Sequence, residues 1–146
     1  MPEVDVHGPI DTTVIEFPEG SSGAETAKAL LNLVESGVIR LYDLMLVSRV
    51  GTDGWRVIDI TAGPDGEMEE FFVFAGAQSG LIDADDAAAL ADVIQPGYVG
   101  AVLIYENAWA IPFVAAARAE GGELVASSRL SADQVMDALD ASEPTE

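Results

Sequence analysis

The sequence predicts an α+β fold in which two βαβ halves flank an insert. The first observation is the stretch 97–130, where an apolar, β-branched run precedes an Ala-rich segment with helical spacing and then a short second β-type run. The second is that residues 12–50 repeat this order. The third is the pair Gly121 and Gly122, which ends the second helix. We therefore predict a ferredoxin-like sandwich, with 51–97 as a hairpin and helical insert.

Composition limits the function classes. A chain of 146 residues fits a single domain, 1–146, and can bury a core. Its net charge of −20 repels nucleic acid phosphates and anionic lipid surfaces. No Lys or Arg occurs from Val57 to Ala117, so no basic patch forms there, and we expect no nucleic-acid partner. The absence of Cys excludes disulfides and thiolate chemistry.

The first half, 12–50, is predicted to contain a strand at 12–17, a helix at 23–36 and a long strand at 38–50. Ser22 followed by Glu25 has the spacing of a capping box. The helix has one apolar stripe with the spacing i, i+3, i+4, i+7, formed by Ala27, Leu30, Leu31 and Val34.

The insert begins with a hairpin loop at 51–54 and a returning strand at 55–61. Asp83 is expected to cap a short helix at 84–94, with acidic residues in its first turn. Between these, helical spacing relates Met68, Phe71, Phe72 and Ala75.

The second half, 98–130, is predicted to contain a central strand at 98–105, a helix at 107–120 and a strand at 123–128. Asn107 is a suitable N-cap, but Pro112 would then lie one turn inside the helix. The alternative is a helix that starts at Ile111, with Pro112 at its first position.

The terminal segment, 131–146, is predicted to contain a helix that ends near Leu139 and is opened by a capping box of Ser131 and Gln134. A rival fold places the last strand outside the sheet. In that arrangement a βαββαβ unit forms the sheet, with the final helix and strand as an extension; its strands are 12–17, 38–50, 54–61 and 98–105.

Five stretches carry a resemblance to a mostly actinobacterial family described as a domain of unknown function. They are GPIDTTVIEFPEG (8–20), ESGVIRLYDL (35–44), GLIDADDAAALADVIQPG (80–97), YENAW (105–109) and GGELVASSRL (121–130). The resemblance implies no established activity, and therefore no catalytic residue or cofactor.

The second half is also similar to a broader family of small bacterial proteins described as membrane proteins of unknown function. Those proteins carry a long glycine-rich apolar hairpin between two βαβ halves. Here that place holds EMEEFFVFAGAQSGLI (67–82), which is short and contains three Glu. We therefore expect no direct membrane insertion.

The best site candidates are Glu106, Asn107 and Trp109, because residues just past a strand end often line sites in α/β sheets and Trp is a frequent interface anchor. The alternative is that Asn107 caps a helix and Trp109 is a core aromatic. Tyr42 and Trp55, on a hairpin that projects beyond the sheet, are the second candidate for a ligand or interface site.

Other polar groups have simpler interpretations. His7, the only histidine, could act as an acid, base or ligand, but we expect a solvated residue in an N-terminal arm. The acidic residues 83–86 lack the spacing of a calcium loop and suit a helix N-terminus. The carboxylates at 67–70 suit a solvated face beside a buried one, and 76–80 suits a joint between helices. We predict no metal and no cofactor.

We therefore expect a non-catalytic binding or assembly module that forms a homo-oligomer, with a further protein partner compatible with the same surfaces. The alternative is a small-ligand binder or enzyme that uses a cleft near Glu106 and Trp109. The N-terminal sequence MPEVDVHGPIDTT lacks the basic and apolar regions of a signal peptide, so we expect a cytoplasmic location.

Overall fold

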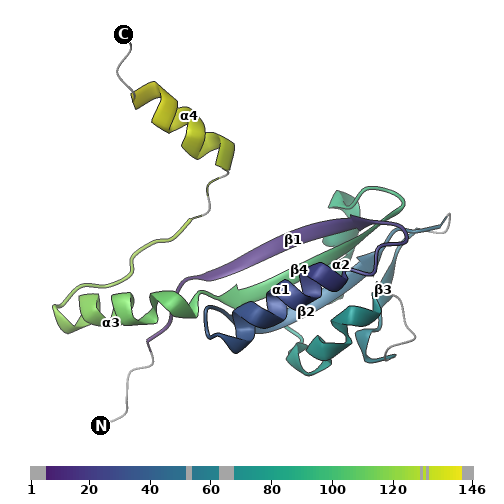
Figure 1. Cartoon of the computed structure of the whole chain (residues 1–146), viewed down its shortest axis with the longest axis horizontal. Helices are drawn as coiled ribbons and strands as arrows, with labels where there is room; N and C mark the ends of the chain where they lie inside the picture. Colours follow the sequence, from purple (N-terminus) through teal and green to yellow (C-terminus); the bar gives the residue numbers. More distant parts are fainter. Residues whose placement is uncertain (1–5, 52–53, 63–67, 129, 131, 143–146) are drawn as a thin grey trace.

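A mixed sheet-and-helix architecture is present in the computed structural model, which describes residues 6–51, 54–62, 68–128, 130 and 132–142 (Figure 1). The elements, with η for 3-10 helices, are β1 (Ile10–Pro18), α1 (Ala24–Glu35), β2 (Arg40–Ser48), β3 (Arg56–Ile58), η1 (Ile60–Ala62), η2 (Glu69–Ala77), α2 (Ala84–Val93), β4 (Tyr98–Glu106), η3 (Ala108–Ala110), α3 (Ile111–Ala119) and α4 (Ala132–Ser142).

The four strands form one antiparallel sheet in the order β1-β4-β2-β3. Since β1 and β2 are both antiparallel to β4, they are parallel to each other, with β4 between them. The units β1-α1-β2 and β3-α2-β4 are therefore interlocked, each with a strand of the other between its own two strands. The α+β class is confirmed, and the sheet uses the four strands of the rival arrangement.

The predicted strand at 123–128 is wrong, because residues 122–128 form no strand. The reason lies in α3, which continues away from the end of the sheet (Figure 1). Pro112 occupies the first turn of α3, so the alternative start at Ile111 is confirmed and Asn107 does not begin the α-helix. The chain beyond α3 therefore starts far from the sheet edges.

Both faces of the sheet are covered by helices, because β2 and β4 alternate apolar side chains between two cores. Leu44 and Leu46 of β2 pack with α1 and η2 on one face. Val47 packs with α2 on the opposite face. The predicted insert is therefore integral to the fold: η2 contributes Phe71, which is 0% exposed, and α2 closes the second core.

The start of α1 differs from the predicted capping box of Ser22 and Glu25. The N-cap is Gly23, which has φ +67 and no side-chain cap hydrogen bond. A Cβ at Gly23 would approach Met68 and Phe71 to 2.7 Å each, so a glycine permits both the left-handed turn and the close packing of η2. The Asp83 cap of α2 is confirmed, with Asp86 completing a capping box.

The last described helix, α4, contacts neither core and has no buried residue. Figure 1 shows it well apart from the sheet. Ser131, the predicted cap of this helix, lies outside the described residues, as do Thr52 and Asp53 of the hairpin loop and Glu67. Within the described part of the chain, no helix combines the length and apolar content needed to cross a bilayer.

Candidate functional site

The polar centre of the molecule lies where β4 ends. Glu106 is the last residue of this strand and lies opposite Ile10 of β1 on one side and Arg40 of β2 on the other. Its side chain is 0% exposed, which is unusual for a carboxylate without compensating partners. The structure supplies those partners from both neighbouring strands and from the N-terminal segment.

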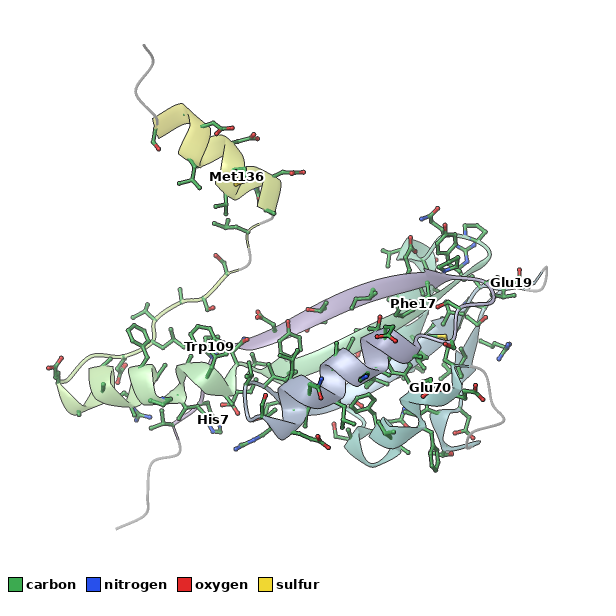
Figure 2. All side chains as sticks on the ribbon, viewed as in Figure 1. His7, Phe17, Glu19, Glu70, Trp109 and Met136 are labelled. Carbon is green, nitrogen blue, oxygen red and sulfur yellow. The ribbon has the colours of Figure 1, made fainter. Side chains whose placement is uncertain are left out.

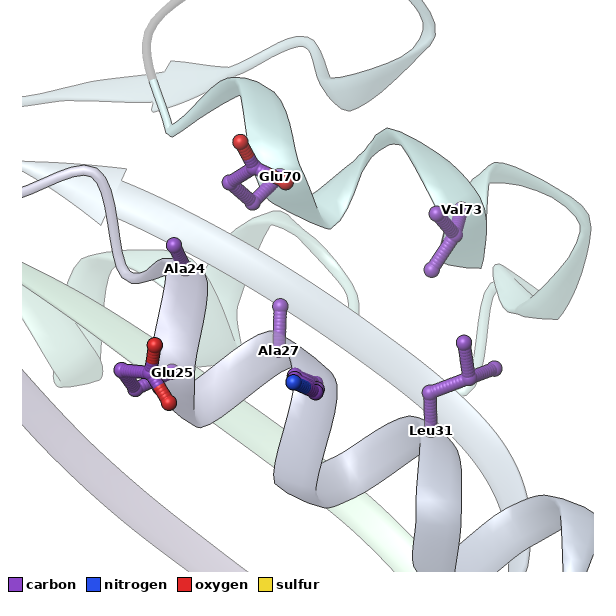
Figure 3. A pocket seen from close by; sticks show the side chains of 7 residues that line it. Ala24, Glu25, Ala27, Leu31, Glu70 and Val73 are labelled. Carbon is purple, nitrogen blue, oxygen red and sulfur yellow. The ribbon is translucent and has the colours of Figure 1, made fainter.

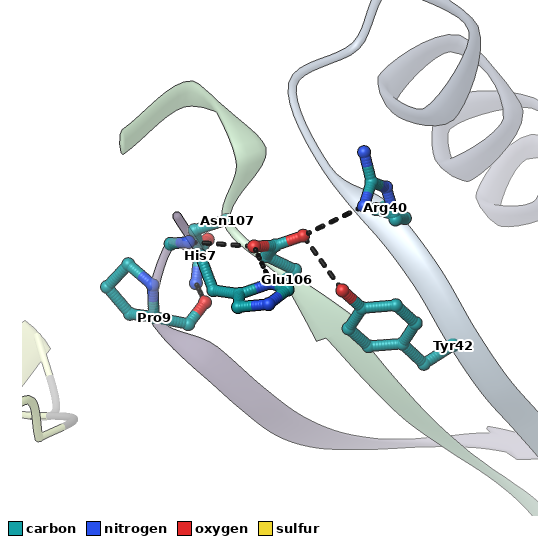
Figure 4. A network of polar contacts seen from close by, with 7 residues as sticks. His7, Pro9, Arg40, Tyr42, Glu106 and Asn107 are labelled. Carbon is teal, nitrogen blue, oxygen red and sulfur yellow. Dashed lines mark hydrogen bonds and ion pairs between the residues drawn. The ribbon is translucent and has the colours of Figure 1, made fainter. Parts of the chain in front are cut away.

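Four groups surround the Glu106 carboxylate (Figure 4). The Gly8 backbone N–H donates to Oε2 over 2.7 Å, and the Tyr42 hydroxyl donates to Oε1 over 2.9 Å. His7 Nδ1 lies 3.3 Å from Oε2, and Arg40 Nη1 lies 3.6 Å from Oε1. Both oxygens are therefore occupied by donors or cations, and residues 7 and 8 are tied to the ends of β2 and β4.

These partners keep Glu106 ionised. Burial acts to raise the pKa of Glu106, but the hydrogen bonds from Tyr42 and Gly8 and the charges of Arg40 and His7 together lower it below its ordinary value. The pKa of Tyr42 is raised by burial and by its hydrogen bond to Glu106. The pair is therefore a neutral phenol that donates to a carboxylate, which is a stable arrangement at neutral pH.

A β-bulge brings Tyr42 to this site. The pairing of β2 with β4 shifts between Leu41 and Asp43, so Tyr42 has no partner of its own on β4. By simple alternation Tyr42 would share a face with Leu44, which contacts α1 and η2. The bulge instead allows its hydroxyl to reach Glu106. The prediction that Tyr42 lies on a projecting hairpin with Trp55 is therefore wrong.

The N-terminal segment is held to the same place by Asn107. Its backbone N–H donates to the Pro9 carbonyl over 2.8 Å, and its side-chain Nδ2 donates to the Pro9 carbonyl and to Asp11 Oδ2, each over 2.9 Å. A Cβ at Gly8 would collide with the carbonyl oxygen of Asn107, so only glycine fits this approach. Asn107 stands at the N-cap position of η3, but its side chain makes no cap hydrogen bond there and instead tethers β1.

The predicted site residues separate into two groups. Glu106, Asn107 and Tyr42 come together, and Trp109 lies beside them because its indole Nε1 donates to Asn107 Oδ1 over 3.3 Å. Trp109 is 63% exposed, so the alternative that it is a core aromatic is wrong. Trp55 precedes β3, whose Arg56 pairs with Ser48 near the opposite end of β4.

Sequence inspection missed the contributions of His7, Gly8 and Arg40. His7 was expected to be solvated; its side chain is 55% exposed, yet it contacts Glu106. These partners lie 66 to 99 positions from Glu106 in the sequence, so no local spacing could have linked them. The one available signal was the glutamate at the end of an apolar strand, since a carboxylate buried there needs partners.

A second buried carboxylate, Asp43, has a structural role. Its Oδ1 accepts from the Leu44 and Ser79 N–H groups, over 2.9 and 3.2 Å, and its Oδ2 accepts from the Ile82 N–H over 2.7 Å. Asp43 thereby fixes the connection between η2 and α2 to the bulge in β2. Backbone N–H groups alone can satisfy a buried carboxylate in this way.

The chemistry open to the Glu106 centre is limited. A buried carboxylate whose pKa is lowered is poorly suited to exchange a proton with a solute, but it can orient the ring of His7 through Nδ1. Next to His7 is an open hollow of about 360 Å³, lined by His7, Gly8, Val114, Arg118, Glu123 and Leu124. We call Glu106 and its four partners, His7, Gly8, Arg40 and Tyr42, the clamp. The imidazole of His7 is more than half exposed within it.

Another hollow, of about 270 Å³, lies between α1 and η2 (Figure 3). Ala27, Leu31 and Val73 provide its apolar surface, whereas Glu25 and Glu70 contribute carboxylates. No group of three or more metal-ligating side chains occurs in the ranges that the structure describes. Lys28 also lines this hollow, so its apolar walls carry two carboxylates and one ammonium group but no convergent catalytic set.

The fold and the clamp define an α+β protein with a helix-covered antiparallel sheet and a buried carboxylate that secures its N-terminal segment. The chain belongs to the family of unknown function DUF6325, whose family model matches residues 6–144. Comparison with curated proteins and with solved structures finds no match.

Proposed function

We propose that this protein is a non-catalytic assembly module that forms a homo-oligomer. The observation that carries the proposal is the apolar surface of the chain after residue 107. Large apolar side chains are exposed along this whole region, namely Trp109, Phe113, Leu124, Val125, Leu130, Val135, Met136 and Leu139. So many exposed large apolar side chains in one stretch of a chain favour an interaction surface that a partner covers.

The helix α4 supports the same proposal. It has 11 residues, and a helix of that length is marginal in water without tertiary packing. Its apolar residues follow the spacing i, i+3, i+4, i+7, which is typical of a helix that packs on another surface: Ala132, Val135, Met136 and Leu139. A partner surface would therefore stabilise it.

The clamp at Glu106 is compatible with a structural role. Its carboxylate oxygens are occupied from within the chain, and the carboxylate itself is covered. This arrangement supports positioning of the N-terminal segment better than acid–base catalysis on a bound substrate.

Light scattering over a range of protein and salt concentrations tests the proposal. We expect a mass above the 15.3 kDa of one chain, and association that strengthens with salt, because 20 net negative charges on each chain repel one another. A mass of one chain at every concentration, in both low and high salt, would contradict the proposal.

The second candidate is a small-ligand binder, favoured by the hollow of about 360 Å³ beside His7, whose volume lies within the range of small-molecule sites. Chemical-shift changes of the single imidazole on addition of small-molecule metabolites would support it. We also propose that the protein is cytoplasmic and that its relatives are mostly actinobacterial. A peripheral membrane role, suggested by the similarity to small membrane proteins of unknown function, is opposed by the net charge of −20, and real binding in a vesicle sedimentation assay would overturn this view.

A further inference from the structure

The outer edge of β1 pairs with no other strand that the structure describes. β1 is the terminal strand of the sheet, and it pairs with β4 residue by residue over its nine positions without a bulge. It contains no Lys or Arg, its two carboxylates, Asp11 and Glu16, accept hydrogen bonds from Asn107 and Gln95 of the same chain, and its single Pro is at the last position. Soluble proteins normally protect such an edge with charge, bulges or short length, so this edge is suited to pairing with another strand.

An apolar groove lies directly beside this edge. It has a volume of about 220 Å³ and is formed where α1 meets β1, on the face that α1 covers. None of its lining residues is charged: they are Ile15, Phe17, Thr26, Ala29, Leu30, Leu33, Phe71, Ala101 and Leu103. The edge and the groove adjoin, because Ile15 and Phe17 of β1 line the groove.

The C-terminal arm, which the structure describes over residues 121–128, 130 and 132–142, contains one segment suited to the edge and one suited to the groove. Residues 123–128 are extended and unpaired, although Leu124 and Val125 favour a strand. The amphipathic helix α4 follows after three residues. Figure 2 shows Met136 of this helix far from the sheet and from α1.

We propose that the arm of one chain completes the sheet of a second copy. Residues 123–128 add as a fifth strand along the outer edge of β1, and α4 then packs its apolar face into the groove between α1 and β1. This inference rests on the proposed function, because it names the surfaces through which the homo-oligomer forms. Reciprocal exchange of the two arms gives a closed dimer.

The reach of the arm favours a second copy over its own chain. The helices η3 and α3 carry the chain roughly 20 Å beyond the end of β4, given the rise of 3-10 and α-helices. Six extended residues span roughly 20 Å, so 123–128 would be used up in returning along α3. Of the two edge strands that the structure describes, β1 has nine residues and β3 has three, so the β1 edge of another copy can pair with this segment along its whole length.

The negative charge of α4 favours the groove beside β1 over the hollow between α1 and η2. The described α4 carries Asp133, Asp137 and Asp140 and no basic residue. The hollow between α1 and η2 presents Glu25 and Glu70 beside a single Lys28, so its lining has a net negative charge, which would repel such a helix (Figure 3). The groove beside β1 has no charged lining, so α4 can bury its apolar face there while its carboxylates stay in water.

Cross-linking between two single-cysteine variants tests the inference directly, since the natural chain has no Cys. Leu33→Cys places a thiol in the groove, and Met136→Cys places one on the apolar face of α4. Both residues are exposed in the single chain, so both variants should fold. Mixed in equal amounts with a short bis-maleimide, they should give a covalent heterodimer.

The matched control replaces Leu33→Cys with Val93→Cys. Val93 is also exposed but belongs to α2, which covers the opposite face of the sheet. This variant should not link to Met136→Cys. Linking of equal efficiency at Leu33 and Val93 would overturn the inference, because it would show that contact is not confined to the groove.

The remaining outcomes separate the two levels of the proposal. A Leu33→Cys/Met136→Cys double variant that links only within one chain would overturn the second copy as the occupant. A missing Leu33–Met136 link in a protein that light scattering shows to be oligomeric would overturn this interface and leave the proposed function intact. A missing link in a monomer would overturn both.

A substitution on α4 gives an independent readout. Met136→Asp should raise the dissociation constant of the oligomer by about tenfold or more, because it places a charge in an apolar groove. Asp137→Asn, on the polar face of the same helix, should leave the constant unchanged or lower it by reducing repulsion. An unchanged constant for Met136→Asp would overturn the inference.

Discussion

The chain up to Glu106 and the chain after it contrast in how their apolar side chains are covered. In the first part, α1, η2 and α2 cover the two faces of the sheet, and residues such as Leu44 and Leu46 are fully buried. In the second part, only Ala110 and Val114 are buried among the apolar residues of the described chain. The contrast is between a region that completes its own core and a region that offers apolar surface.

The helices α1 and α4 show what this difference teaches. Both have apolar residues at i, i+3, i+4 and i+7, and the sequence predicts an amphipathic helix in each case. In α1 the stripe contacts the sheet and buries Ala27 and Leu30, whereas α4 buries nothing. Periodicity predicts that a helix has an apolar face, but it does not identify what covers that face.

The largest expected effect comes from deleting a core aromatic. Phe71 is 0% exposed and packs edge-on against Phe17, so Phe71→Ala should lower the free energy of unfolding by about 3–5 kcal/mol. The matched change is Phe113→Ala in α3, where the side chain is 75% exposed. It should change the free energy of unfolding by about 0.5 kcal/mol or less.

Chemical denaturation at several protein concentrations measures both variants. The loss in Phe71→Ala should not depend on concentration, because the residue is internal to one chain. If Phe113→Ala destabilised a dilute, monomeric protein as much as Phe71→Ala does, the contrast between the two regions would be refuted.

The next largest effect concerns the clamp that joins the N-terminal segment to the sheet. Glu106→Gln replaces a charge-assisted acceptor with an amide that cannot satisfy all its donors, so unfolding should become easier by about 2–4 kcal/mol. Tyr42→Phe removes a single hydrogen bond to the carboxylate and should cost about 1.5–3 kcal/mol. Equal stability of wild type and Glu106→Gln would show that the clamp contributes nothing.

The clamp should also have a pH dependence of known sign. Because the pKa of Glu106 is lower in the folded protein than its ordinary 4.5, its stabilising contribution is present above that value and is lost as pH falls through the folded pKa. The difference in unfolding free energy between wild type and Glu106→Gln should therefore be largest near neutral pH. It should shrink below pH 4.5; a difference that grew there would contradict this assignment.

Much of the fold was predictable because its signals are local. The apolar runs of β2 and β4, the stripe of α1 and the Asp83 cap are each readable from a few neighbouring residues. The strand at 123–128 was mispredicted for the opposite reason. Its sequence favours a strand, but a strand forms only when an edge lies within reach, and that depends on the direction of α3.

The site was predictable only in part. Glu106 and Asn107 could be proposed from their position after a strand, but their partners come from residues 7–9 and from β2. Tyr42 reaches Glu106 only because a bulge interrupts the alternation of β2, and no residue in 40–44 signals a bulge by itself. Nonlocal pairing and register are therefore what the sequence alone could not supply.

The smallest expected effect on stability, and the sharpest test of the contrast, is at Trp109. Its indole is 63% exposed, and its backbone N–H, which donates to the Val38 carbonyl over 3.1 Å, is unaffected by a side-chain change. Trp109→Ala should therefore alter the free energy of unfolding by about 0.5 kcal/mol or less. If Trp109 anchors an interface, the same change should weaken self-association by more than about 2 kcal/mol.

The control for Trp109 is Trp55→Ala, since Trp55 is also exposed but lies before β3, near the other end of the sheet. Sedimentation equilibrium of both variants beside wild type separates the two aromatic candidates. Association weakened only by Trp109→Ala would place the interface on the region after Glu106. Weakening by Trp55→Ala alone would place the interface at the β2–β3 end. It would then show that the exposed apolar side chains after Glu106 do not form the interface.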